Sequence, residues 1–75
     1  MKWVIAAAFV VNGVILDQSV NPTPFETKRE CEETIHINSL GFPINWDGEK
    51  WVITVPDDSP EDRNVEVWAV CVEKE

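Results

Sequence analysis

Basic residues are scarce in this sequence, which has six Lys and Arg against fourteen Asp and Glu and a formal net charge of −8. A nucleic-acid backbone or an anionic membrane surface is bound mainly by Lys and Arg side chains, so this shortage argues against direct binding to either. The acidic balance fits simple solubility or a positively charged protein partner better. We therefore expect no nucleic-acid partner and no membrane partner.

Side chains for catalysis are also few, because His36 is the only histidine. It follows Cys31 by five residues on a predicted helix, about 140° away around the axis, which is outside hydrogen-bond reach for a nucleophile pair. With Cys71 added, this set would still lack a fourth zinc ligand. The sequence also has no phosphate-binding glycine loop and no serine with a nearby base. We predict a protein that is not an enzyme and needs no cofactor or metal.

No hydrophobic run is long enough to cross a bilayer; the one near the N-terminus has about half the required length. A lysine before this run resembles the start of a secretion signal, but Asn12-Gly13 stands where a small-x-small cleavage site would be expected. The sequence thus predicts a cytoplasmic protein, with a secreted or periplasmic location as the alternative.

What the chain does have is a strong hairpin signal. Asn12-Gly13 joins two apolar segments, and a two-residue type I′ turn requires positive φ at both central positions. We predict strands over Lys2–Val11 and Val14–Ser19, with Asn21-Pro22-Thr23-Pro24 ending the second. The turn sets three cross-strand pairs: Val11 with Val14, Phe9 with Leu16, and Ala7 with Gln18.

A single helix is predicted after these prolines. Thr27 with Glu30 three residues later forms a capping box, Phe25 can pack back onto the first turn, and Gly41 can end the helix. The body spans residues 28–39. Its apolar stripe is narrow, so the helix depends on packing against a sheet.

The remainder predicts two further strands, Glu49–Val55 and Val65–Glu73, with an irregular or short edge segment at Phe42–Trp46. A chain of 75 residues holds one core, so we predict a single domain over residues 1–75. Its class is α+β and its order ββαββ, with one helix on one face of a four-stranded antiparallel or mixed sheet. The first and last strands should be central and the other two should be edges.

The predicted sheet leaves one face without a helix. If Cys71 faces the helix near Cys31, strand alternation sends other apolar side chains to the opposite face. A soluble monomer rarely exposes so large a patch, which predicts a protein interface, either in a homo-oligomer or with another protein. The residues predicted for this interface are Val4, Ala6, Ala8, Val10, Trp68, Val70 and Val72.

Cys31 and Cys71 are the only cysteines, and two interpretations stay open for them. A disulfide between them would close a long loop and contribute roughly 4 kcal/mol in the chain-entropy treatment. In a reducing cytosol they would instead be buried thiols that face each other.

One loop gathers four acidic residues: Asp57, Asp58, Glu61 and Asp62. These residues could hold a hard cation, but the loop lacks the ligand spacing and the central glycine of an EF-hand. The alternatives are a solvated loop and a negative surface that docks on a basic protein.

Trp46 and Trp51 flank the Asp47-Gly48 turn, and the spacing predicts that they pair across two strands. Such a pair serves either structural packing or a platform for a carbohydrate or a peptide.

The segment Phe25-Glu26-Thr27-Lys28-Arg29-Glu30-Cys31-Glu32, with Ala69-Val70-Cys71-Val72 near the end, resembles a group of short bacterial and phage proteins. Those proteins open with a strand hairpin, begin their helix with F-x-T-x-x-x-C and end in a Cys-containing strand. The resemblance spans most of the chain and implies no activity, because that group has no assigned function.

We therefore predict a small acidic, non-enzymatic protein-interaction domain that self-associates or docks on a partner protein through the bare sheet face. In a phage or mobile-element setting, such a domain would inhibit a host complex. The alternative is a secreted or periplasmic domain, held by a Cys31–Cys71 disulfide, that binds a ligand through Trp46 and Trp51.

Overall fold

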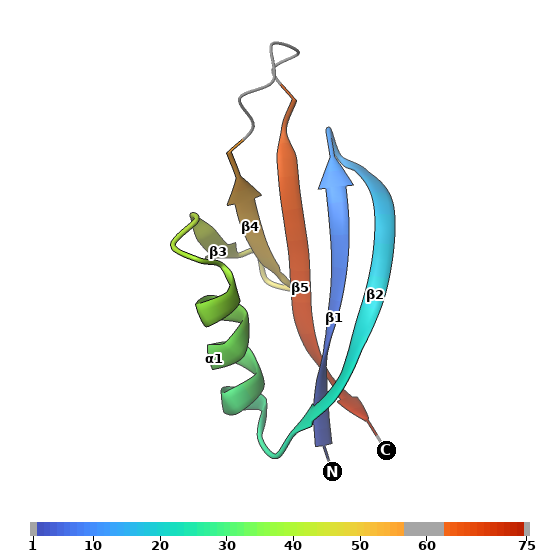
Figure 1. Ribbon diagram of the computed structural model, residues 1–75, viewed down its shortest axis with the longest axis vertical. Coiled ribbons are helices and arrows are strands. Elements are labelled where there is room, and N and C mark those ends of the chain that lie inside the picture. The colour runs from blue at the N-terminus through green and yellow to red at the C-terminus, as the bar shows by residue number, and fades with distance from the viewer. Residues whose placement is uncertain (1, 57–62, 75) are drawn as a thin grey trace.

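The computed structural model describes residues 2–56 and 63–74. These residues form five strands and one helix: β1 (Lys2–Val11), β2 (Val14–Phe25), α1 (Lys28–Asn38), β3 (Ile44–Trp46), β4 (Trp51–Val55) and β5 (Val65–Lys74). All paired strands are antiparallel, in the spatial order β2-β1-β5-β4-β3. Figure 1 shows α1 against one face of a long twisted sheet, near the end that carries both chain termini. The predicted α+β class is confirmed.

The two most apolar strands, β1 and β5, lie at the centre of the sheet as predicted. They pair along their whole length, from Lys2 opposite Lys74 to Val11 opposite Val65. The prediction of four strands is wrong in one detail, because residues 44–46 form a paired strand of their own. This strand covers the outer side of β4, so β4 is not an edge and the order is ββαβββ.

The β1–β2 hairpin turns at Asn12 and Gly13, whose φ angles of 52° and 81° are both positive. A β-branched residue would be strained there, and Asn-Gly satisfies the geometry. Val11 lies opposite Val14 as predicted. The turn is also held to the start of β5, because the Asn12 N–H donates to the Asn64 carbonyl oxygen at 2.8 Å.

Beyond this closing pair the predicted register is wrong by one residue. Ile15 lies opposite Val10, but Asp17 lies opposite Phe9, so Leu16 is an extra residue in β2. Such a bulge shifts every later pair. Ala7 consequently faces Ser19 and not Gln18.

The prediction that the prolines end β2 is also wrong, since the strand continues to Phe25. A proline removes one ladder donor, which costs little on an edge strand whose outer side faces solvent. A second register shift falls in this segment, between the pairs of Ile5 with Asn21 and Trp3 with Phe25.

Helix α1 begins and ends close to the predicted positions. The Thr27 hydroxyl oxygen accepts a hydrogen bond from the Glu30 N–H at 3.1 Å, so the predicted cap is present. Positive φ angles at Leu40 and Gly41 then turn the chain out of the helical path. The helix contributes two buried side chains, Cys31 and Ile35, to a core completed by the sheet residues Ile5, Ile53, Ala69 and Cys71.

Candidate functional site

Cys31 and Cys71 form a disulfide bond that ties α1 to β5. Their Cα atoms are 6.1 Å apart, within the usual range for a disulfide, and both residues are buried. The prediction that the two sulfurs face each other is confirmed, and they are bonded to each other and not free thiols.

The face opposite the helix is less open than predicted. Val4 is 3 % exposed and Val10 is 0 % exposed, so the chain itself covers both side chains. Val10 is flanked by Ile15 of β2 and Glu66 of β5, and the irregular end of β2 runs past Val4. The prediction that these two valines lie bare on the surface is wrong, because both side chains are buried within the chain itself.

The other five residues of that predicted interface remain at least partly accessible. Ala6, Ala8, Trp68 and Val70 are half-buried, and Val72 alone is exposed. A hollow of about 210 Å³ lies over the alanines and Trp68. This face is therefore a modest apolar surface.

A charged pair borders this hollow. The Lys50 ammonium lies 4.5 Å from the centre of the Trp68 ring and 2.7 Å from Oδ2 of Asp47. Oδ1 of Asp47 accepts hydrogen bonds from the N–H groups of Glu49 and Lys50, at 2.8 Å each. The bond to Lys50, followed by these backbone bonds, lowers the pKa of Asp47 to about 2. The same carboxylate raises the pKa of Lys50.

The open surface of the molecule lies instead along β2. Every residue of this strand except Phe25 is exposed, and Asp17 is its one charged residue. Leu16 is 62 % exposed and Val20 is exposed to a similar degree. No strand among the described residues pairs with its outer side. The sequence predicted that β2 is an edge strand but not how long its open edge is, because the prolines indicated a strand half as long.

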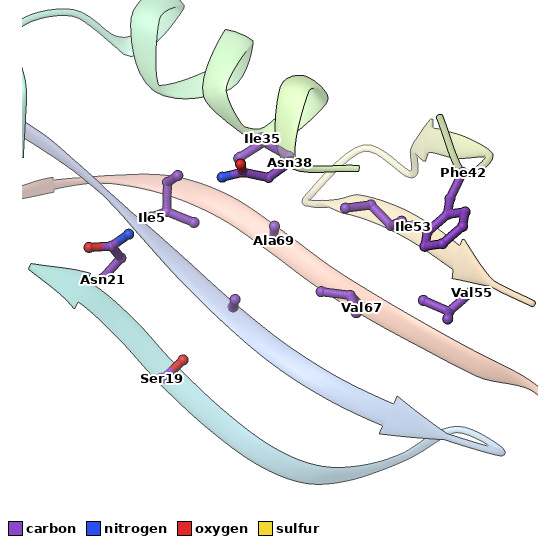
Figure 2. Close-up of a pocket in the computed structure, with 11 residues that line it drawn as sticks. Ile5, Ser19, Asn21, Ile35, Asn38, Phe42, Ile53, Val55, Val67 and Ala69 are labelled. Carbon is purple, nitrogen blue, oxygen red and sulfur yellow. The ribbon is translucent and has the colours of Figure 1, made fainter. Parts of the chain in front are cut away.

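The helix-covered face holds a larger hollow. A cavity of about 350 Å³ opens beyond the C-terminal end of α1, over β1 and β5 (Figure 2). Its lining combines apolar side chains with the hydroxyl of Ser19 and the carboxamides of Asn21 and Asn38. Sequence reasoning did not find this cavity, because nothing in the pattern indicates where the helix ends relative to the strands.

The two tryptophans at the β3–β4 turn pair across the strands as predicted. The ring centres of Trp46 and Trp51 are 5.1 Å apart, and His36 of α1 meets the Trp51 ring edge-on at 4.4 Å. The Trp51 indole N–H donates to a Glu32 carboxylate oxygen at 3.3 Å. These contacts hold α1 against Trp51 of β4 and involve both the ring and the indole N–H of Trp51, which favours packing as the role of the pair.

The acidic residues Asp57, Asp58, Glu61 and Asp62 lie outside the described residues. Within residues 2–56 and 63–74, no three His, Cys, Asp or Glu side chains gather in a way that could hold a metal ion. None of the helices in that part of the chain is long and apolar enough to span a membrane.

These features define a small acidic α+β domain with one internal disulfide, a long open edge strand and an uncharged cavity beside its helix. Comparison with family models, curated proteins and solved structures gives no match to this chain. Its function is therefore argued from its own surfaces.

Proposed function

We propose that this protein is a non-enzymatic interaction domain whose edge strand β2 pairs with β2 of a second copy. The observation that carries the proposal is the exposure of a twelve-residue edge strand with a single charge, in a chain of net charge −8. Edge strands of soluble monomers are usually short or interrupted by charge, because an open edge is a template for another strand. The prolines interrupt only one end of β2; residues 14–20 carry one bulge, at Leu16, and one N–H bonded within the strand, from Gln18 to Oδ1 of Asp17 at 2.9 Å.

The sequence of β2 is complementary to itself in one antiparallel register. Centred on Gln18, this register places Leu16 of one copy opposite Val20 of the other. Asp17 then lies opposite Ser19, and the two Gln18 residues lie opposite each other. Two apolar side chains face each other, two carboxamides face each other, and a carboxylate faces a hydroxyl. All three are favourable cross-strand pairs. A two-fold axis through the Gln18 pair makes the Leu16–Val20 and Asp17–Ser19 contacts occur twice each.

Charge favours this strand as the point of contact. Two chains of net charge −8 repel each other, and the repulsion is least where the surface carries the fewest charges. Salt screens that repulsion, so self-association should strengthen as salt is added. Docking on a basic protein, the other form of the predicted interaction, would weaken with salt.

Sedimentation velocity over a range of concentrations tests the proposal. The wild type should form a dimer that is tighter in 0.5 M than in 0.05 M sodium chloride. Val20→Lys should weaken the dimer by at least about tenfold, or about 1.4 kcal/mol, because it places a lysine opposite Leu16.

Val72→Lys is the matched control, since Val72 is an exposed valine on the face opposite the helix. It should leave the dimer constant nearly unchanged. A wild type that stays monomeric at all concentrations and salt levels contradicts the proposal. Dissociation by Val72→Lys and not by Val20→Lys would assign the interface to the sheet face instead.

A further inference from the structure

The helix covers only part of its face of the sheet, and a cavity remains where it ends. After Asn38 the chain turns away through Leu40 and Gly41, whose positive φ angles prevent the helix from continuing over β1 and β5. The space left has a volume of about 350 Å³. This lies within the range of small-molecule sites, roughly 300–1,000 Å³. In Figure 2 the cavity lies between the end of α1, the Phe42 side chain and the strands beneath.

Most of the lining is apolar. Strands β1 and β5 supply the floor, while α1, β4 and the segment before β3 supply the walls. The small side chains of Ala7 and Ala69 account for part of the depth, since they leave space that larger residues would fill.

Three polar side chains line the cavity, two of them on β2 and one at the end of α1. They are the Ser19 hydroxyl and the carboxamides of Asn21 and Asn38. The Thr23 N–H donates to Oδ1 of Asn21 at 3.0 Å, which leaves the amide nitrogen of Asn21 to face the cavity, as Figure 2 shows. This nitrogen is a donor, so the group it would bind is an acceptor oxygen.

No Asp, Glu, Lys, Arg or His is among the described residues that line the cavity. This is notable in a chain with fourteen acidic residues. An ion that enters an apolar site loses its hydration and needs an opposite charge to replace it, and this lining provides none. The lining therefore selects against charged ligands.

We propose that this cavity is a binding site for an uncharged amphiphilic molecule. Its apolar body would lie over Ala7 and Val67, and its carbonyl or hydroxyl oxygen would accept a hydrogen bond from Asn21. Medium-chain amides, ketones and alcohols have this chemistry. The site uses the face of the sheet that carries α1, and two of its lining residues, Ser19 and Asn21, belong to β2.

Binding of Nile red, an uncharged dye that bears a carbonyl group, is the direct probe. Its fluorescence should rise on binding, and nonanamide should displace it at a concentration at least about tenfold lower than nonanoate does at pH 8, a difference of about 1.4 kcal/mol. This comparison uses the wild-type protein, so it holds whether or not any variant folds. Equal displacement by the amide and the carboxylate would overturn the proposal.

Two neighbouring alanines of β1 provide a matched pair of variants. Ala7→Leu fills the floor of the cavity and should weaken Nile red binding by about tenfold or more. Ala8→Leu points to the opposite face, where it borders the smaller hollow, and should change binding by less than about twofold. Circular dichroism checks that both variants are folded. Loss of binding in Ala8→Leu alone would move the dye to the opposite face.

The same titration in Val20→Lys separates the cavity from the proposed dimer contact. Binding should persist in this variant, because Val20 does not line the cavity. If binding disappears with the dimer, the dye occupies the contact between copies and the cavity proposal is wrong.

Discussion

The helix-covered end of this sheet and its β2 edge are built from similar apolar residues but differ completely in exposure. Under α1, Ile35 is 2 % exposed and the Cys31–Cys71 disulfide is buried. Along β2, the side chains of Leu16 and Val20 face solvent over most of their surface. Position in the sheet, and not hydrophobicity, therefore decides which of these residues stabilise the monomer and which remain available for a partner.

A charge placed in the buried region and the same charge placed on the open strand should have very different consequences for stability. Val10→Asp buries a carboxylate at a fully covered position and should destabilise the fold by about 4 kcal/mol or more. Leu16→Asp places the charge on the open strand and should change the stability of the monomer by about 0.5 kcal/mol or less. Urea unfolding, at a protein concentration where sedimentation finds only monomer, measures both. Similar losses in the two variants would contradict the assigned burial.

Removing the disulfide tests the covered end alone. The bond closes a loop with a sequence separation of 40 residues, and in the chain-entropy treatment its loss costs about 4 kcal/mol. Unfolding of the wild type with and without a reductant gives this difference without any substitution. An unchanged unfolding midpoint, with intact mass confirming reduction, would mean that the bond does not stabilise the fold.

Two isoleucines of α1 provide a smaller and better matched test. Ile35→Ala removes a buried side chain from the core and should cost about 3 kcal/mol. Ile37 is 72 % exposed, and Ile37→Ala should cost about 0.5 kcal/mol or less. Thermal unfolding of both variants provides the comparison. If Ile37→Ala were the more damaging substitution, the helix would pack on the sheet through a different face.

The smallest expected effect concerns acid stability at the β3–β4 turn. The pKa of Asp47 lies at about 2 in the fold, below its ordinary value of 3.8, because of its bonds to Lys50 and the turn backbone. The ionised carboxylate therefore stabilises the fold above about pH 4, and this contribution is lost as the pH falls towards 2. Asp47→Asn should flatten the decline of unfolding free energy between pH 4 and pH 2. An unchanged slope would mean that other groups account for acid unfolding.

Local signals predicted much of this architecture. Asn12-Gly13 identified the hairpin, and Thr27 with Glu30 identified the start of the helix. In each case a short stretch of sequence determines the local geometry. The aromatic pair at the β3–β4 turn was predictable for the same reason.

The features that sequence reasoning missed depend on neighbours distant in the chain. The Leu16 bulge and the continuation of β2 past Pro22 and Pro24 become possible only because β2 lies at an edge. The burial of Val4 and Val10 depends on how the rest of the chain packs around β1, which alternation along one strand does not reveal. The two candidate sites also depend on distant neighbours. The edge of β2 is open because no other described strand pairs with its outer side, and the cavity exists because α1 ends before it covers all of β1 and β5.

The proposed pairing of β2 with itself about Gln18 can be observed by isotope-filtered NMR on a mixture of labelled and unlabelled protein. We expect contacts between copies from Gln18 to Gln18 and from Leu16 to Val20. Contacts between copies that arise instead from Trp68, Val70 and Val72, in a sample shown to be dimeric, would contradict it.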